Sequence, residues 1–506
     1  MLPTRMSDAS PPLDPALPRW AAPALIATLV AGVAFRLHSG SALWLDEALT
    51  VNIASVPLAD LPDRLRHDGS PPLYYALLHL WMRVFGDSDI AVRSMSSVFA
   101  LATIPVAYLA GLRIARDRIT ALYAVALLAA SPFAIRFATE ARMYALIMLL
   151  TALGILIVDR ALERPNVARL LPLAAVSAAL VMTHYWTSFV LVATTGVVLL
   201  FRRARRVAAT TLAGAALAVV PWLPVLLYQV KHTGTPWAAA PGLHVALAAV
   251  TDYAGGYSQT GAFLSLLMLG LAAIAVFGRP AGPRAILLRL PGERRPTALA
   301  ALSLGGVAVG VLASVLLRSG FAARYAAIAL VPFLLLVAFG IRKLPSPRTQ
   351  AVVVAVCVVL GLIGAVPLVH NPRSQAGLVA AAINDDAGPG DLVVYCPDQL
   401  GPAVSRRLPD DMDQLVYPTK GAPQFVDWVD YRERNRAAVP ETFADDVLRQ
   451  AGGRTIWLVW ANGYRTFTED CQTLRDTLLV ARGETRVVRR MGRYFEKMML
   501  YRYPGS

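Results

Sequence analysis

Long apolar runs separated by short polar segments dominate the first 370 residues of the chain. Each is near the length of about 18–20 residues at which an α-helix crosses the hydrocarbon core of a bilayer. The runs lie near residues 20–37, 90–112, 119–135, 143–159, 168–183, 187–201, 208–228, 260–277, 298–317, 325–341 and 350–369. This pattern predicts a mainly helical, polytopic membrane protein with about eleven transmembrane helices in residues 19–369.

The ends of these runs predict the topology. The first run, WAAPALIATLVAGVAFRL, lacks a small-residue cleavage site with the usual flanks, so we expect an uncleaved anchor helix. The Pro-rich residues 1–18 before it are expected to form a disordered cytoplasmic N-terminus. Basic clusters such as FRRARR follow the even-numbered runs, where the cytoplasmic loops would lie. An odd number of helices then places residues 370–506 on the extracytoplasmic side.

Three of the predicted outer segments are too long or too polar for plain turns. Residues 38–89 form the first, and they contain PPLYYALLHLWMRVFG, which is apolar and aromatic but short for a membrane span. We expect this stretch to be a helix lying at the membrane surface. Residues 229–259 and 318–326 form the other two outer loops.

The C-terminal region, residues 370–506, has a different pattern. GDLVVYCP, DQLVYP and RTIWLVWANG are typical of short buried strands, and ETFADDVLRQAG and TEDCQTLRDTLLVARG of amphipathic helices. Their alternation predicts a small extracytoplasmic α/β domain. It has no phosphate-loop or dinucleotide fingerprint.

The chain has three cysteines, which differ in their surroundings. Cys396 and Cys471 both fall in the C-terminal region, and we expect a disulfide between them if that region faces an oxidising compartment; the alternative is two buried thiols. Cys357 lies in the last apolar run and is expected in the core.

Composition and charge agree with this picture. The 506 residues are 56% hydrophobic and 16% charged, with a mean hydropathy of +0.52. The formal net charge of +15 could suggest nucleic acid as a partner. Most of that excess lies in the predicted cytoplasmic loops, whereas residues 370–506 carry 18 basic and 18 acidic side chains. The charge is therefore the positive-inside signal of a membrane protein, and no nucleic-acid partner is expected.

Candidate chemistry gathers at the predicted outer face. Asp46 and Glu47 stand side by side in SALWLDEALTVNIA, just after the first helix. Other polar side chains come from later loops: His67, Tyr74, His79, Arg136, Glu140, Arg142, Tyr144, His184, Lys231, Arg318, Arg324 and Tyr325. Ionisable residues near membrane depth are costly and usually face a cavity or a partner. A carboxylate among cations suits a site where a general base deprotonates a hydroxyl and arginines hold a phosphate leaving group.

An ordered set of motifs across residues 20–340 resembles glycosyltransferase family 39 and its relatives. The motifs are DE after the first helix, PPLYY…HLW…FG, R…EARMYAL, and ARY before a late helix. This group includes protein O-mannosyltransferases and aminoarabinose transferases, which are membrane enzymes of the GT-C superfamily. Ser70 departs from the pattern, because relatives often have His or Lys directly before the Pro-Pro pair.

The resemblance implies a glycosyltransferase of the cell membrane that acts at the extracytoplasmic face. Such enzymes take a sugar from a polyprenyl-phosphate donor and invert its anomeric centre. It implies Asp46 as the base, with Glu47 adjacent, and Arg324 at the donor phosphate; Arg136, Arg142 and Lys231 are further candidates for the phosphate. The remaining candidates, His67, Tyr74, His79, Glu140, Tyr144, His184 and Tyr325, would contact substrate. A bacterial envelope glycan, lipid or protein is the expected acceptor, and mannose or arabinose the sugar.

Several alternatives stay open from the sequence. Glu47 could contact the acceptor or a divalent metal, or it could be the partner of a nearby arginine. Asp46 could be a helix N-terminal acid favoured by the helix dipole, and His79 a hydrogen-bonded core histidine. A transporter or lipid-linked-sugar flippase would also have many helices and buried charges, but it would tend to show repeated halves, and we find none. A noncatalytic scaffold is the third alternative.

Overall fold

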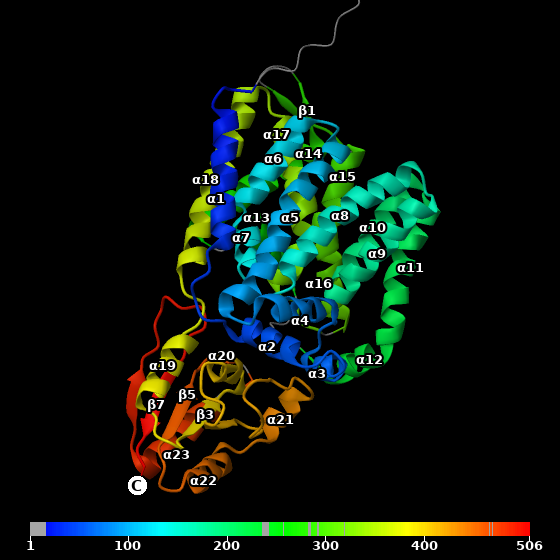
Figure 1. Cartoon of the computed structure of the whole chain (residues 1–506). Helices are drawn as coiled ribbons and strands as arrows, with labels where there is room; N and C mark the ends of the chain where they lie inside the picture. The colour runs from blue at the N-terminus through cyan, green and yellow to red at the C-terminus, as the bar shows by residue number, and fades with distance from the viewer. Residues whose placement is uncertain are drawn as a thin grey trace, which may run out of the picture.

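A computed structural model describes residues 17–234, 242–256, 258–281, 285–290, 293–317, 319–464, 466–467 and 469–505. Most of the predicted disordered N-terminus, and Arg318, lie outside these residues. Figure 1 shows a bundle of long helices with a small sheet unit at one end, and with α2, α3 and α4 between the two. The protein is therefore mainly helical, as its hydrophobic pattern predicts.

Seven helical segments among the described residues are long and apolar enough to cross a membrane, or eight if one bent pair counts as a span. They are α5 (Asp89–Ala115), α8 (Tyr144–Glu163), α11 to α12 (Arg205–His232), α14 (Gln259–Phe277), α15 to α16 (Arg294–Leu316), η4 to α17 (Ala323–Arg342) and α18 (Pro347–His370). The bent pair is α6 (Arg118–Ala130) and α7 (Pro132–Ala138), which meet at 58°. The chain is thus a multi-pass membrane protein.

Every one of the eleven apolar runs is helical in the structure. Three of them form helices shorter than the seven spans: α1 (Ala21–Leu37), α9 (Val167–Thr183) and α10 (Thr187–Val197), which η1 extends to Arg202. A fourth short apolar helix, α13 (Leu243–Ala254), lies in the predicted outer loop 229–259. The number of helices that cross the membrane therefore stays a prediction.

The segment between α1 and α5 forms three short helices, α2 (Leu45–Ser55), α3 (Leu61–Asp68) and α4 (Leu73–Phe85). Helix α4 covers the stretch expected at the membrane surface. One of its faces is fully buried through Tyr74, Tyr75 and Leu78, while Val84 and Phe85 are exposed. Helix α3 ends at Gly69, whose φ of 85° favours a residue without a Cβ.

The C-terminal sheet has five strands in the order β4-β3-β5-β7-β6. Strands β4 (Asp413–Val416), β3 (Leu392–Cys396) and β5 (Ile456–Trp460) are mutually parallel, whereas β7 (Met499–Tyr503) runs antiparallel to both of its neighbours, β5 and β6 (Thr485–Val488). The flanking helices are α19 (Ala376–Asp386), α20 (Gly401–Ser405), α21 (Tyr431–Ala437), α22 (Pro440–Ala451) and α23 (Asp470–Arg482). The three parallel strands and both α22 and α23 coincide with the predicted elements. A separate two-stranded hairpin, β1 (Gly278–Pro280) with β2 (Ile286–Leu288), follows α14.

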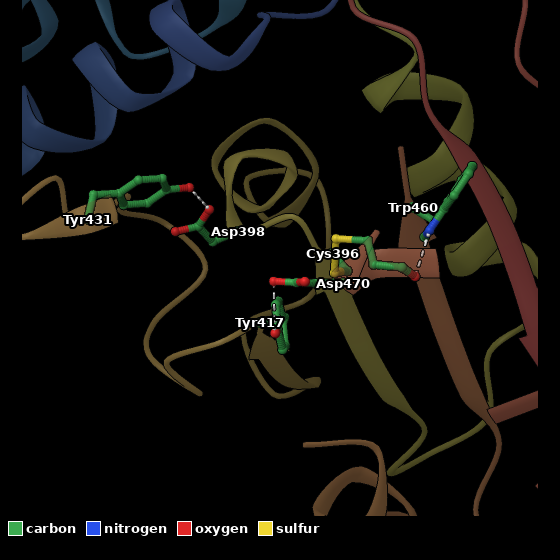
Figure 2. The surroundings of a disulfide bond; sticks show 7 residues. Cys396, Asp398, Tyr417, Tyr431, Trp460 and Asp470 are labelled. Carbon is green, nitrogen blue, oxygen red and sulfur yellow. Dashed lines mark hydrogen bonds between the residues drawn. A yellow bond between two sulfur atoms is a disulfide. The ribbon is translucent and has the colours of Figure 1, made fainter. Parts of the chain in front are cut away.

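A disulfide joins the end of β3 to the start of α23 (Figure 2). It links Cys396 to Cys471 with a Cα–Cα distance of 5.5 Å, as expected if this region lies in an oxidising compartment. The indole N–H of Trp460 donates to the carbonyl of Cys471 at 2.9 Å. The hydroxyl of Tyr431 donates to the buried carboxyl of Asp398 at 2.6 Å, so the polar groups beside the disulfide are hydrogen-bonded.

The sheet unit is hydrogen-bonded to the segment between α1 and α5. The amide of Asn52 on α2 donates to the carbonyl of Gln424 at 2.7 Å. The N–H of Trp428 donates to the carbonyl of His67 at 3.0 Å. The N–H of Leu45, at the start of α2, donates to the carboxyl of Glu496 at 3.0 Å. These contacts fix α2 between the helix bundle and the sheet unit.

Candidate active site

Helix α2 carries the two adjacent acids in its first turn, where unpaired backbone N–H groups favour negative charge. Successive residues of an α-helix are rotated by about 100° around its axis, so the two side chains leave the helix in different directions. The side chain of Glu47 is completely buried, whereas that of Asp46 is 18% exposed. The two carboxylates therefore belong to different surroundings.

Glu47 is held by a bidentate ion pair with Arg93 of α5. Arg93 Nε lies 2.7 Å from Glu47 Oε1, and Arg93 Nη2 lies 2.5 Å from Oε2. The N–H of Ala141 also donates to Oε1, at 2.9 Å. Burial by itself would raise the pKa of Glu47, but the charge and hydrogen bonds of Arg93 outweigh it, and the pKa is lowered. The geometry favours the alternative in which Glu47 is the partner of an arginine.

The ion pairs around Glu47 extend to a second acid. Arg373 Nη1 lies 3.7 Å from Glu47 Oε1 and 3.2 Å from Glu140 Oε1. Arg136 Nε lies 3.2 Å from the same oxygen of Glu140. We call Glu47, Arg93, Arg136, Glu140 and Arg373 the Glu47 network. Arg93 and Arg373 were not among the residues selected from the sequence, although a charge inside the predicted helix 90–112 was a signal for Arg93.

Asp46 has fewer fixed partners. Its Oδ2 lies 3.4 Å from Arg324 Nη2 and accepts no hydrogen bond from the described residues. The Asp46 backbone carbonyl accepts from Arg142 Nη1 at 3.3 Å, and the same nitrogen donates to Thr50 Oγ1 at 2.6 Å. A partly exposed carboxylate that is ion-paired but not held by hydrogen bonds at Oδ2 can accept a proton from a substrate hydroxyl.

Aromatic rings line the site beside these arginines. The ring of His184 lies between those of Tyr144 and Tyr325, with centroid distances of 6.1 and 4.8 Å. The hydroxyl of Tyr144 is buried and has no hydrogen-bond partner among the described residues. Burial, aided by the charges of Arg142 and Arg324, lowers the pKa of His184 to about 3, so this side chain is neutral at physiological pH. We call Asp46, Arg142, Tyr144, His184, Arg324 and Tyr325 the Asp46 cluster.

Comparisons with known proteins agree on one fold. A family model described as dolichyl-phosphate-mannose-protein mannosyltransferase matches residues 69–228. The structure of ArnT from Cupriavidus metallidurans bound to undecaprenyl phosphate has a TM-score of 0.60 at 13% identity, covering 96% of this chain and 98% of that one. The chain therefore has the fold of this membrane glycosyltransferase structure, and residues 69–228 match the family model.

Two further solved structures have the same fold. The apo state of the Cupriavidus metallidurans ArnT has a TM-score of 0.61 at 13% identity, covering 95% of this chain and 97% of that one. An oligosaccharyltransferase from Archaeoglobus fulgidus, tethered to an acceptor peptide, has a TM-score of 0.50 at 11% identity, covering 87% of this chain and 69% of that one. No curated protein sequence matches the chain.

Other predicted site residues support the structure or lie elsewhere. The hydroxyl of Tyr74 bonds Ser96 Oγ at 3.0 Å, and Ser96 Oγ donates to the carbonyl of Arg142 at 3.2 Å, so Tyr74 supports the backbone of Arg142. His79 Nδ1 lies 2.8 Å from the carbonyl of Ala54, which fits a hydrogen-bonded core histidine.

His67 and Lys231 lie on the segments that face the sheet unit. His67 Nδ1 lies 2.8 Å from Asp427 Oδ1. Lys231 is exposed at the end of α12, and no ion pair joins it to another described residue. Within the described ranges, no group of three or more His, Cys, Asp and Glu side chains forms a metal-binding cluster.

Proposed function

We propose that the protein transfers a sugar from a polyprenyl-phosphate carrier to an acceptor hydroxyl, with Asp46 as the general base. The observation that carries this proposal is the partly exposed carboxylate of Asp46, whose Oδ2 is ion-paired with Arg324 but accepts no hydrogen bond from the described residues, within a GT-C fold. Glu47 cannot take the same role, because Arg93 and the N–H of Ala141 occupy both of its oxygens.

The reaction would be a single displacement. The acceptor O–H gives its proton to Asp46 while the acceptor oxygen forms a bond to the anomeric carbon of the sugar. The bond from that carbon to the carrier phosphate breaks at the same time, and the phosphate leaves with the electron pair. Because attack occurs opposite the leaving group, the anomeric centre is inverted. Arg142 and Arg324 would stabilise the growing negative charge on the phosphate.

A lipid-linked donor is supported by two of the comparisons. The family model names dolichyl-phosphate-mannose, and one solved ArnT structure holds undecaprenyl phosphate. We therefore propose a polyprenyl-phosphate sugar as donor and an envelope glycan, lipid or protein as acceptor. Mannose or arabinose remains a prediction for the sugar.

We also propose that the Asp46 cluster and the sheet unit face the extracytoplasmic side of the cell membrane. The disulfide between Cys396 and Cys471 supports this orientation, since such bonds persist in oxidising compartments. The distribution of basic loops supports the same orientation.

The test is a carrier-release assay. Purified full-length protein would be incubated with a panel of polyprenyl-phosphate sugars and mixed acceptors, and the freed carrier phosphate would be quantified. We expect release with at least one donor and strongly reduced release from Asp46→Asn. Asp60→Asn, an exposed acid just before α3, is the matched control and should behave as the parent protein. No release with any donor, or undiminished release from Asp46→Asn, would contradict the proposal.

A further inference from the structure

A cavity of about 280 Å³ lies where the end of α18 meets the sheet unit, and the Asp46 cluster does not line it. Its wall is made by Trp44, Arg136, Glu140, Pro367, Leu368, Asn371, Pro372, Arg373, Arg493, Tyr494 and Phe495. Figure 1 shows the segment between β6 and β7, drawn in red, passing beside this end of α18. Because α18 is a candidate span that ends at His370, the cavity lies near one surface of the membrane.

The charge of this cavity favours an anion. Three arginines line it, against the single acid Glu140, and two of them share one oxygen of that acid. The third, Arg493, is exposed and makes no ion pair with another described residue; its guanidinium lies 5.3 Å from the ring of Tyr494. One wall group, Trp44 Nε1, has no hydrogen-bond partner within the described part of the chain, whereas Arg373 Nη1 is ion-paired with Glu140 and Glu47. The wall therefore has an excess of positive charge, an arginine without an ion pair and one unused donor.

The rest of the wall is apolar and aromatic. Trp44 and Phe495 meet edge to face with centroids 5.2 Å apart, and the guanidinium of Arg136 lies 5.5 Å from the ring of Phe495. Phe495 is 62% exposed although it lies beside the end of a membrane span. Aromatic rings with arginines at this depth are typical of residues that contact the headgroup layer of a bilayer.

We propose that this cavity binds the phosphate group of an anionic phospholipid headgroup at the membrane surface on the side of the sheet unit. The three arginines would hold the phosphate oxygens, and Trp44, Leu368 and Phe495 would contact the glycerol and upper acyl carbons. The bound lipid would join α18 to the segment before β7. This site does not depend on the sugar transfer proposed above, since Asp46, Arg142 and Arg324 do not line it.

The test uses full-length protein in a neutral detergent. Dioctanoyl-phosphatidylglycerol, dioctanoyl-phosphatidylcholine and inorganic phosphate would each be titrated, with binding followed by calorimetry and thermal stability. We expect the anionic lipid to bind and to raise the melting temperature, and the zwitterionic lipid to bind at least several-fold more weakly. Phosphate should compete with the anionic lipid but bind less tightly alone.

Two variants test whether phosphatidylglycerol binds at this cavity. Arg493→Gln should weaken phosphatidylglycerol binding by on the order of ten-fold, the value of one charge-assisted hydrogen bond. Arg489→Gln, an exposed arginine of the same segment that does not line the cavity, should change it less than about two-fold. Carrier release should be normal in Arg493→Gln.

Three results would overturn the proposal. If Arg493→Gln and Arg489→Gln lose the same amount of phosphatidylglycerol affinity, only general surface charge attracts the lipid. Equal affinity for phosphatidylcholine, or for phosphate alone, would remove the anionic phospholipid as the ligand. Reduced carrier release in Arg493→Gln, with competition by a polyprenyl phosphate, would make the cavity part of the donor path.

Discussion

Asp46 and Glu47 are consecutive residues with opposite surroundings. Glu47 is fully buried, and both of its oxygens are engaged by Arg93 and a backbone N–H. Asp46 is partly exposed, and its Oδ2 has an arginine at 3.4 Å but no hydrogen bond from the described residues. The comparison teaches that proximity to arginines does not by itself mark a catalytic acid. What separates the two acids is whether the carboxylate is buried and held at both oxygens by hydrogen bonds.

The two surroundings also differ in how they affect stability. A buried, bidentate pair such as Glu47 with Arg93 offsets the cost of removing both charges from water only while both partners are present. The Asp46 cluster keeps part of its charge exposed and some of its polar groups unsatisfied, which costs stability and leaves capacity for a substrate. We therefore expect substitutions at Glu47 to affect folding and substitutions at Asp46 to affect the reaction.

The largest expected effect is that of Glu47→Gln on stability. The substitution leaves Arg93 buried without its charged partner, which should cost about 3–5 kcal/mol of unfolding free energy. Thermal or denaturant unfolding of the protein in detergent would measure it, and activity would fall together with the folded fraction. The double variant Glu47→Gln with Arg93→Met removes both charges and should recover part of the loss. A stable but inactive Glu47→Gln protein would instead give Glu47 a chemical role.

Asp46→Asn is expected to impair the reaction and not the stability of the protein. An amide cannot take the proton of the acceptor, so we expect kcat to fall by about 10²–10⁴-fold. The melting temperature should change little, since Oδ2 of Asp46 accepts no hydrogen bond among the described residues. Single-turnover carrier release, measured beside a donor-binding assay, would show whether the loss lies in chemistry rather than in binding. Equal losses of kcat and of donor affinity would argue against the general-base role.

A smaller effect is expected when Arg324 is changed to lysine. Lysine keeps the charge but loses the planar fork that holds two phosphate oxygens, so kcat/KM for the donor should fall by about ten-fold. Arg136→Lys is the matched change in the Glu47 network, because the Nε of Arg136 lies 3.2 Å from Glu140. It should leave donor kinetics within about three-fold. Similar losses in the two variants would mean that both arginines contact the carrier phosphate.

Sequence patterns predicted much of the fold. Each of the eleven apolar runs is helical, because a span of lipid-facing helix needs a continuous apolar stretch. Strands β3, β4 and β5 were predicted from short buried runs. Strands β6 (Thr485–Val488) and β7 (Met499–Tyr503) were not, because charged residues interrupt them and they pair only through tertiary contacts.

For the candidate site, the sequence predicted several of the residues but not the ion-pair partners of Glu47 and Glu140. Motifs brought Asp46, Arg142 and Arg324 together as candidates, and the structure places them in one cluster. The partner of Glu47 could not be identified from the sequence, because Arg93 is 46 positions away and its side-chain direction depends on how α5 packs against α2. Arg373 follows the last span in a plain polar segment, so only the folded chain shows that it reaches Glu140.

The last expected effect concerns Glu496, which lies near both acids in the segment before β7. Its carboxyl accepts from the N–H of Leu45 at 3.0 Å and from Ser374 Oγ at 2.5 Å, so it joins the sheet unit to the start of α2. Burial raises the pKa of Glu496 from 4.5 to about 7, with the negative charges of Asp46 and Glu47 adding to the shift.

This shift sets a direction for the pH dependence of stability. The folded protein binds the proton of Glu496 more tightly than the unfolded chain, so the contribution is fully present below pH 4.5 and is lost as the pH rises through about 7. The loss should be at most about 3 kcal/mol. In Glu496→Gln the side chain stays neutral and can still accept from Leu45, so the melting temperature should vary less between pH 5 and 8 than in the parent protein.

The control for this change is Glu441→Gln, which removes an exposed carboxylate of the same sheet unit and should keep the parental pH profile. If the melting temperature of Glu496→Gln varies with pH as in the parent protein, Glu496 does not titrate between pH 5 and 8. If Glu496→Gln also changes the pH dependence of kcat, the proton on Glu496 acts on Asp46 through the first turn of α2. Asp46 and Glu47 would then share one electrostatic neighbour, and the separation between the Asp46 cluster and the Glu47 network would hold for hydrogen bonding but not for charge.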